Sequence, residues 1–334
     1  MTIKEIAKKA NVSIASVSLA LNNKAGIGDE TRERIIRIAN ECGYKPYKRK
    51  NTDALSGNIR FIKYSDSGLI VDRSKEHISE IIDSVESELR NRGMNLLLTT
   101  FITKDNFEDI FDLVDDSSID GIVFLGTELC DDVCKRLLDI KIPMVVIDNY
   151  APTYNINCIQ ANNKEIVIDA IKYLRDTGHK TVGYLRSKID VSCFLERSQG
   201  FREGLQLCNL PYFPGMEFKV TPTMFNSFNE LTSVFMDTPL LPSAFFCDND
   251  MIAIGAMKAL GKLGYKVPKD VSIIGFGDIP YATYFDPPLT TMHVDVAEIA
   301  KLSVQLLMNY VNKEINTVTK VQTSARLVIR KSTR

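Results

Sequence analysis

Histidine is scarce in this 334-residue chain: the three that occur, His77, His179 and His293, lie far apart in the sequence. No Ser/His/Asp or Cys/His set is therefore recognisable, and the sequence also lacks a glycine-rich phosphate-binding loop. Both absences argue against the common hydrolytic and nucleotide-dependent enzymes. We expect a protein that is not an enzyme and needs no cofactor.

Cysteines and long apolar runs are limited as well. The seven cysteines are an odd number in apolar or helical contexts, which fits buried thiols in a reducing compartment better than a disulfide framework. Cys130 and Cys134 share one face of an expected helix, but no histidine clusters with them, so we expect no metal site. No run reaches the ~18 apolar residues of a membrane span, and residues 1–5 lack the apolar stretch of a secretory signal. We therefore expect a cytoplasmic protein with no membrane partner.

Apolar residues make up 45% of the chain and charged residues 25%, as in globular proteins that bury a full core. The length exceeds the ~250 to 300 residues at which single cores stop growing, so two or three compact units are expected. Residues 1–50 hold eleven Lys/Arg against five Asp/Glu, whereas residues 51–334 hold thirty against thirty-seven. A small cationic unit thus precedes a large acidic one, and the cationic unit suits a polyanion partner.

The first 47 residues predict three short amphipathic helices. Thr2 and Glu5 form a capping box that starts the first helix, Ser13 can cap the second after a tight turn, and a third opens at residues 29–32 and ends at Gly43. Two short helices joined this closely are typical of a helix-turn-helix, although a three-helix bundle without a nucleic-acid role stays open on these grounds alone. The apolar positions expected in the shared core are Ile3, Ile6, Ala7, Ala10, Val17, Ala20, Leu21, Ile35, Ile36 and Ala39.

From residue 58 onward, short apolar runs alternate with amphipathic helices. This alternation predicts parallel sheets covered by helices on both faces, and its repetition predicts two similar α/β lobes. The first series covers residues 59–64, 74–92, 96–100, 107–114, 121–125, 130–140 and 144–148. The second covers residues 165–177, 181–186, 195–208, 228–236, 244–247, 251–264 and 271–276.

Ligands of open α/β lobes bind beyond the carboxyl ends of the strands. Residues directly after the apolar runs are therefore the candidates for a binding site. They are Tyr64, Ser65, Thr127, Glu128, Asp148, Asn149, Ser187, Asn249, Asp250, Gly277 and Asp278.

Several blocks of the sequence resemble the lactose/galactose repressor family of transcriptional regulators. In the first unit these are residues 2–7 (TIKEIA), 12–13 (VS), 16–18 (SVS), 21–22 (LN), 30–32 (ETR) and 43–46 (GYKP), in order and at the same spacing. Further matches lie at residues 120–122, 143–148, 178–179, 183–184, 197, 200–201, 249–250, 253–255, 267–268, 275–276 and 287–291, so the resemblance covers nearly the whole chain. It implies an all-α helix-turn-helix headpiece followed by a two-lobed α/β domain like the periplasmic binding proteins, with parallel sheets.

The resemblance also implies domain boundaries. The headpiece covers residues 1–47, a hinge or linker residues 48–58, and an effector-binding and dimerisation domain residues 59–334. Within that domain the first lobe is expected at about 59–160 plus 290–319, and the second at about 161–289 plus 320–334. The chain would cross between the lobes near residues 157–160, 287–291 and 320.

By this resemblance the helix that starts near Ile14 enters the major groove of DNA, where Ile14, Ala15 and Leu19 face base edges. The family often carries Arg or His where this chain has Leu19, so contact with thymine methyl groups, rather than a bidentate bond to guanine, is expected. We expect a half-site different from the lactose type. Contacts to phosphates or elsewhere on the duplex are expected from Thr2, Ser13, Ser16, Ser18, Asn22, Thr31 and Tyr44.

Residues 47–57 are polar and charged, as in a connector between domains. In the family this stretch becomes a hinge helix on DNA and inserts a leucine into the minor groove. Here Lys50 and Asp53 replace the residues that the family prefers, which leaves Leu55 as the wedge candidate, two positions out of register. A flexible tether whose Lys48 and Arg49 touch phosphates stays open as an equal alternative.

The resemblance implies a sugar or sugar derivative in the cleft between the lobes. Arg197 and Asn249 would bond its hydroxyls from the second lobe and Asp148 from the first, while Phe194 or Tyr64 would cover its C–H face. Together with residues at the strand ends, the expected effector-binding set is Tyr64, Thr127, Asp148, Phe194, Arg197, Asn249, Gly277 and Asp278.

Other roles for these side chains stay open. Arg197 could form an ion pair with Glu196 or Glu203 on a helix surface, and Asp148 and Asn249 could be turn residues at strand ends.

One departure bears on the ligand. The family's usual aromatic-Asp-Asp or aromatic-Asp-Asn is Phe276-Gly277-Asp278 in this chain, so the aspartate that commonly clamps a sugar is missing. Either Asp278 compensates or the ligand differs. Lys63, Arg186 and Lys188 leave room for a phosphorylated or acidic sugar.

Together with the charge and helix patterns, the resemblance implies a homodimeric transcriptional repressor that binds a palindromic operator and is controlled by a sugar or sugar-phosphate effector. The alternative is a sugar-binding protein of the transporter type without a regulatory role. Such a protein shares the two-lobed fold but would not carry the headpiece.

Overall fold

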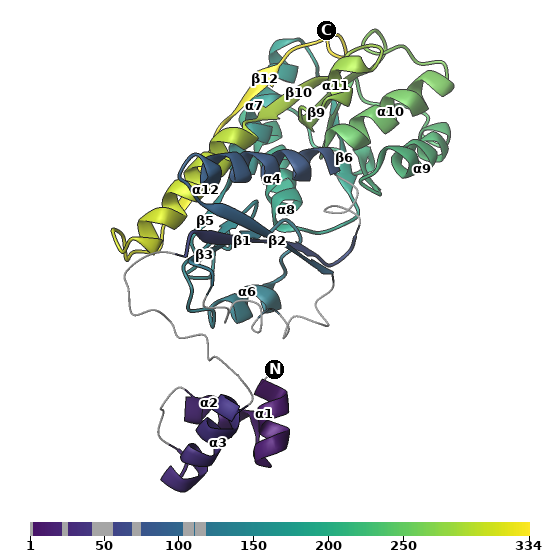
Figure 1. The fold of residues 1–334 in the computed structure, drawn as a ribbon. Helices are drawn as coiled ribbons and strands as arrows, with labels where there is room; N and C mark the ends of the chain where they lie inside the picture. The colour runs from purple at the N-terminus through teal and green to yellow at the C-terminus, as the bar shows by residue number, and fades with distance from the viewer. Residues whose placement is uncertain (1–2, 22–25, 42–55, 69–74, 103–109, 111–117) are drawn as a thin grey trace. The chain divides into compact units, whose positions relative to one another are not determined.

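A computed structural model describes residues 3–21, 26–41, 56–68, 75–102, 110 and 118–334. It divides the chain into two compact units, Met1–Ala54 and Leu55–Arg334 (Figure 1). Six residues expected to contact DNA lie outside the described part: Thr2, Asn22, Tyr44, Lys48, Arg49 and Leu55. The same holds for the side chains of Ile3, Ile14, Ala15, Ser18 and Leu21, and for most of the helix expected at residues 107–114.

The first unit contains three helices, α1 (Ile3–Ala10), α2 (Ile14–Leu21) and α3 (Asp29–Glu41). Ser13 caps α2 as expected, because its Oγ accepts a hydrogen bond from the Ser16 N–H at 3.0 Å. Ile6, Val17 and Ile35, one from each helix, are fully buried in the shared core.

Ile36 does not belong to this core, contrary to the prediction. It is 38% exposed, and Ile38 packs against the core in its place. The reason is helical geometry: Ile35, Ile38 and Ala39 lie three and four positions apart on one face, whereas Ile36 is turned about 100° away from Ile35.

The second unit contains two lobes, each built on a six-stranded sheet. The sheet of the first lobe is parallel throughout, and the helices α4 and α12 cover one face while α6 covers the other. Its strands, from edge to edge, are β11 (Lys320–Thr323), β5 (Cys158–Ala161), β4 (Met144–Ile147), β3 (Gly121–Leu125), β1 (Asn58–Ser65) and β2 (Asn95–Ile102). The helices are α4 (Lys75–Arg90), α6 (Asp131–Leu137) and α12 (Val296–Val311).

The second lobe has the same plan, with α7 and α8 on one face of its sheet and α9 and α10 on the other (Figure 1). Its sheet is parallel apart from β12, which runs antiparallel to β10 at the edge. The strands in order are β12 (Ala325–Val328), β10 (Thr290–Val294), β9 (Ser272–Gly277), β8 (Ala244–Cys247), β6 (Val182–Ser187) and β7 (Glu217–Val220). The helices are α7 (Asn163–Asp176), α8 (Ser192–Leu207), α9 (Met224–Met236), α10 (Asp250–Lys262) and α11 (Tyr281–Tyr284), with the 3-10 helix η2 (Pro214–Met216) before β7.

All three crossovers lie a few residues later in the chain than predicted. The first lies at Asn162, between β5 and α7, two residues after the range predicted. The second lies at Asp295, because β10 pairs with β9 and therefore stays in the second sheet. The third lies at Ser324, because residues 320–323 pair with β5 of the first sheet and only β12 returns to the second.

Among the described residues, none of the helices has both the length and the apolar character to cross a membrane. The apolar stripes instead face the sheets, and one continuous core runs from α4 and α12 of the first lobe to α7 and α8 of the second. The two sheets are therefore held together by packing as well as by the crossovers.

His179 is buried in the second lobe, with 1% of its surface exposed. Its Nδ1 lies 2.9 Å from the Ser243 Oγ, and that hydroxyl donates its own hydrogen to the Thr181 carbonyl, so Nδ1 is the donor. Burial, and less strongly the charge of Arg334, lower the pKa of His179 from 6.5 to about 4.

This pKa predicts loss of stability in acid. The unfolded chain binds the proton first as pH falls, so the free energy of unfolding should drop between about pH 6.5 and 4, by roughly 2 to 3 kcal/mol. His179→Asn keeps a donor for Ser243 but cannot be protonated, and should lose this component. Urea unfolding at pH 7 and pH 4.5 measures it; equal pH dependence in both proteins would contradict the assignment.

Candidate functional site

A cavity of about 100 Å³ lies between the two lobes of the second unit. Its wall is built from the carboxyl ends of strands in both sheets and from the helices that follow them, as expected for open α/β lobes. The lining residues are His77, Ile78, Ile81, Thr127, Ile147, Asp148, Ala161, Cys193, Phe194, Arg197, Asn249, Asp250, Met251, Phe276, Gly277, Ile279, Val294, Val296 and Ile299.

Six of the eight residues expected to bind the effector meet at this cavity. They come from segments far apart in the sequence and from both lobes. These six are Thr127, Asp148, Phe194, Arg197, Asn249 and Gly277.

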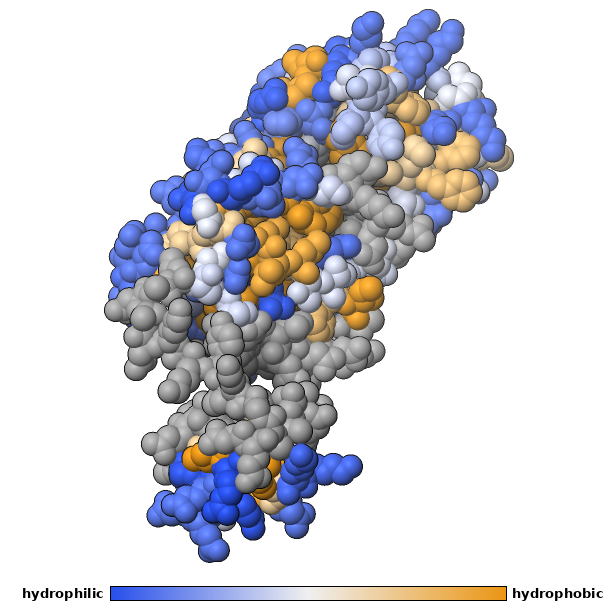
Figure 2. Space-filling model, in the orientation of Figure 1, coloured by the Kyte–Doolittle hydropathy of each residue, from blue (hydrophilic) through white to orange (hydrophobic). Residues whose placement is uncertain are grey.

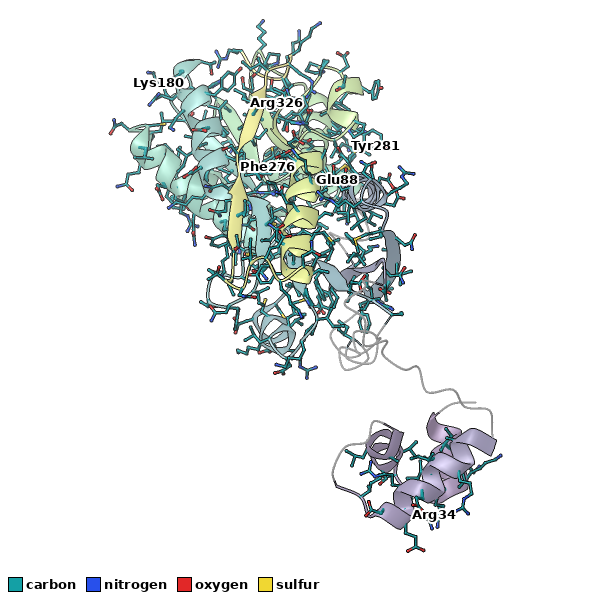
Figure 3. All side chains as sticks on the ribbon, turned by 60° about the vertical axis from the view of Figure 1, so that its left-hand side comes forward. Arg34, Glu88, Lys180, Phe276, Tyr281 and Arg326 are labelled. Atoms are coloured by element: carbon teal, nitrogen blue, oxygen red, sulfur yellow. The ribbon has the colours of Figure 1, made fainter. Side chains whose placement is uncertain are left out.

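Arg197 is the central cation of the site, and 8% of its surface is exposed. Its guanidinium lies over the ring of Phe276, with Cζ 3.5 Å from the ring centroid. Its Nε donates to the Asn163 Oδ1 at 2.9 Å and its Nη1 donates to the Asp248 carbonyl. Figure 3 shows Phe276 inside the second unit and Lys180 at its surface.

The ion pairs weighed as an alternative for Arg197 do not form. Glu203 pairs with Lys164 at 2.6 Å, and Glu196 accepts hydrogen bonds from Gln160 and Asn163. Arg197 therefore lines the cavity and forms an ion pair with neither glutamate.

Asp148 follows β4 directly and takes a left-handed backbone conformation, with φ +63°. This conformation is uncommon for residues other than glycine, although aspartate tolerates it better than most. Its Oδ2 accepts a hydrogen bond of 2.6 Å from the Thr127 hydroxyl, which follows β3. The first lobe thus offers a fixed carboxylate to the cavity.

Asn249 is the N-cap of α10, because its Oδ1 accepts from the Ile252 N–H at 2.8 Å. The amide nitrogen is then the group left to meet a ligand, so Asn249 can act as a donor. The structural alternative for Asn249 at this strand end therefore takes the form of a helix N-cap, and its contact with a ligand stays a prediction.

Buried aspartates on either side hold this turn in place. Asp248 accepts from the Ser187 N–H at 2.6 Å, and Asp250 accepts from the Thr291 hydroxyl at 2.5 Å and the Ile279 N–H at 2.9 Å. Burial raises the pKa of both carboxyls to about 6, although these hydrogen bonds oppose it. The backbone that carries Asn249 and the Asp248 carbonyl is thereby fixed.

Tyr64 was expected at the cavity but does not line it. It is fully buried on the α6 face of the first sheet, with its ring 6.1 Å from that of Phe124. Successive side chains of β1 point to opposite faces, and Tyr64 shares the face of Ile62.

Asp278 also points elsewhere. Its carboxylate pairs with Arg330 at 2.7 Å and with the His293 Nδ1 at 3.0 Å, and it lines a separate hollow beside α4. It therefore does not replace the carboxylate missing at Gly277, whose φ of +128° suits glycine.

Sequence reasoning missed the apolar part of the wall. Ile78 and Ile81 of α4, Ile299 of α12 and Phe276 of β9 reach the cavity, yet their pattern is that of ordinary core residues. Asp250 was among the strand-end candidates and does line the cavity. No signal in a single sequence distinguishes the apolar members from the rest of the core.

The candidate DNA-binding surface is the start of α2 in the first unit. Ser13 and Ser16 lie together there, with their Oγ atoms 2.9 Å apart, at a helix start of the kind that suits a phosphate. Leu19 is half-buried, and its carbonyl accepts from the Arg32 Nη1 at 3.4 Å. Thr31 lies partly exposed on α3, and Arg34 of that helix is exposed (Figure 3).

The described part of the chain contains no group of three or more His, Cys, Asp or Glu side chains that could hold a metal ion. Cys130 is the N-cap of α6 and Cys134 is buried within that helix. Burial raises the pKa of Cys134 to about 11.

Comparison with known families gives two matches. "Bacterial regulatory proteins, lacI family" matches residues 2–47, and "Periplasmic binding protein-like domain" matches residues 171–333. Among curated proteins, the "HTH-type transcriptional repressor CytR" of Escherichia coli (strain K12) is 31% identical over 339 residues, which cover 100% of this chain and 96% of that protein. The "HTH-type transcriptional repressor PurR" of Histophilus somni (strain 129Pt) is 30% identical and covers 99% and 98%.

Solved structures share the fold. A complex of the transcriptional regulator CelR with cellobiose has a TM-score of 0.74 at 22% identity and covers 99% of both chains. The lac repressor dimer bound to operator and the anti-inducer ONPF has a TM-score of 0.73 at 20% identity and covers 100% of this chain and 99% of the other. The expected helix-turn-helix unit followed by a two-lobed α/β domain is confirmed.

The position of Arg197 depends on close contact between α7 and α8. A Cβ at Gly200 would lie 2.4 Å from the Lys164 backbone oxygen, so Gly200→Ala should push the two helices apart and cost about 1 to 3 kcal/mol of unfolding free energy. Gly261→Ala in α10 is the matched control, because nothing lies within 4 Å there and alanine favours a helix. Thermal unfolding of both variants measures the difference; equal stability would contradict the close packing.

Proposed function

This chain belongs to the lacI family of bacterial regulatory proteins and is a DNA-binding transcriptional regulator, and from that premise we propose that the cavity between its lobes binds the effector that controls operator affinity. The observation that carries the proposal is the convergence of Asp148, Arg197 and Asn249 at one cavity. A regulator of bacterial DNA works in the cytoplasm, and we place this chain there. We infer no catalytic activity, since regulators of this family act by binding.

The cavity chemistry fits a sugar or sugar phosphate. Asp148 accepts hydrogen bonds, Arg197 and Asn249 donate them, and such sets fix the hydroxyls of a sugar, while Phe194 and the aliphatic wall suit its C–H face. The CelR relative was solved with cellobiose. A cavity of about 100 Å³ is small beside the ~300 Å³ at the lower end of ligand pockets, which favours a single ring over a longer sugar.

A thermal-shift screen with aldohexoses, pentoses, their phosphates and cellobiose tests this assignment. A compound present at a hundred times its Kd should stabilise the protein by about 2.7 kcal/mol. Arg197→Met should abolish the shift, because the guanidinium is the cavity's buried donor. Arg202→Met is the control, since Arg202 lies on the same helix with 53% of its side chain exposed.

Two results would overturn the sugar assignment. One is a screen in which no sugar and no sugar phosphate raises the melting temperature. The other is a shift that survives Arg197→Met unchanged, which would place the ligand outside this cavity.

The headpiece is proposed to place α2 in the major groove of the operator. The start of α2, with Ser13 and Ser16, would meet phosphate, and Leu19 would contact thymine methyl groups. The exposed cations of α1 and α3 add attraction that does not depend on sequence. These are Lys8, Lys9, Arg34 and Arg37.

Selection of bound duplexes from a random pool tests the role of Leu19. The native chain should return a palindrome, and Leu19→Arg should introduce a guanine preference at one position in each half-site. Leu19→Met keeps an apolar side chain and should leave the preferred sequence unchanged. The same half-site from native and Leu19→Arg proteins would contradict base contact by this residue.

Binding to a palindrome implies a homodimer with two-fold symmetry. The lac repressor neighbour was solved as a dimer on its operator. In this chain β2 is an edge strand of the first sheet, with Leu98 54% and Ile102 60% exposed. Figure 2 shows hydrophobic residues gathered below α4 on this unit, and we propose that a second copy covers this edge.

A further inference from the structure

A carboxylate on the second lobe is bonded to a side chain of the first. Glu196, on α8, accepts hydrogen bonds from the Gln160 Nε2 with both oxygens, at 3.0 and 2.8 Å. Gln160 lies in β5 of the first sheet and is fully buried. The contact therefore joins the lobes next to the first crossover.

Asn163 connects this contact to Arg197. Its Nδ2 donates to the Glu196 Oε2 at 3.1 Å and to the Ala161 carbonyl at 3.1 Å, and its Oδ1 accepts from the Arg197 Nε at 2.9 Å. Asn163 is 1% exposed, and both ends of its amide are bonded, so the side chain has one orientation.

We propose that Gln160, Glu196 and Asn163 form an interlobe strut that positions the Arg197 guanidinium and makes its placement depend on the first lobe. The inference rests on the proposed function, in which Arg197 meets the effector. The three residues act through Arg197 and are positioning residues. If an effector alters the lobe geometry, the change acts on the hydrogen bonds of the strut. These are the bonds that position Arg197, which donates to the effector.

Burying the polar groups of the strut costs free energy, which argues that these residues do more than fill space in the core. Burial raises the pKa of Glu196, whereas the hydrogen bonds from Gln160 and Asn163 lower it. The Oε1 of Gln160 is buried and has no hydrogen-bond partner in the part of the chain that the structure describes. An apolar pair would fill this place at lower cost in free energy.

The two helices that carry Asn163 and Arg197 pack closely against each other. Gly200 brings α8 against the Lys164 backbone at the start of α7, so Asn163 and Arg197 are held on two helices in close contact. Gln160 is the member on the other lobe. A shift of β5 relative to α8 therefore changes the Gln160–Glu196 and Asn163–Ala161 hydrogen bonds directly, and reaches Arg197 through Asn163.

The test is NMR of the full chain labelled with 15N-arginine, without effector, with the Arg197 Nε–H signal assigned by its loss in Arg197→Lys. Asn163→Ala should speed hydrogen exchange at this group at least about tenfold, the ratio expected for one lost hydrogen bond to a charged group. Gln160→Met should shift or broaden the same signal, although no bond joins Gln160 to Arg197. Arg202 on the same helix should keep its signal in both variants.

Gln322→Met is the matched control for Gln160→Met. Gln322 is the register partner of Gln160 on β11, is exposed, and should leave the Arg197 signal unchanged. If Asn163→Ala does not fold, Glu196→Gln carries the test, because one oxygen then remains to accept from both Gln160 and Asn163, and the Arg197 signal should shift.

An Arg197 signal unchanged in folded Asn163→Ala, Gln160→Met or Glu196→Gln protein would overturn the strut. A signal that changes equally in Gln322→Met would do the same, because the effect would then be general. The measurement needs no effector, so it tests the strut even if no sugar binds in the cavity.

Discussion

The site depends on the buried guanidinium of Arg197, which forms no ion pair with a carboxylate in the part of the chain that the structure describes. Burying a charge costs much free energy unless hydrogen bonds or an opposite charge compensate for the water that it loses. Arg197 meets this requirement with a backbone carbonyl, an asparagine side chain and the face of Phe276. Two of these partners are in turn fixed: the carbonyl by the hydrogen-bonded side chains of Asp248 and Asp250, and Asn163 by the contact between α7 and α8.

The fold places this guanidinium where it can report on a ligand. Parallel strands in both sheets end at the same cavity, so side chains from both lobes reach one small volume. Asp148 supplies negative charge from the first lobe, and Arg197 supplies positive charge from the second. A ligand that bonds both is bound to two bodies at once, which is the physical requirement for coupling its binding to a change in their arrangement.

Much of this could be predicted from the sequence, since periodicity and strand ends are local signals. The rule that ligands bind after strands found Thr127, Asp148 and Asn249, and Arg197 came from the family resemblance. The prediction for Tyr64 was wrong because it did not consider which face of β1 the side chain occupies. The prediction for Asp278 was wrong because its ion-pair partner, Arg330, lies in the last segment of the chain. The short strands β11 and β12, separated by Ser324, give no periodic signal that assigns them to different sheets.

We propose that occupation of the cavity beside Arg197 controls DNA binding by the headpiece. The most direct test is titration of a selected palindromic duplex with the full chain, with and without a compound that stabilises it through this cavity. The compound should change the Kd for DNA by about fivefold or more in the native protein, the lower end of allosteric coupling, and should leave the Kd of Arg197→Met unchanged. The same Kd for DNA in the native protein with and without a bound compound would contradict it.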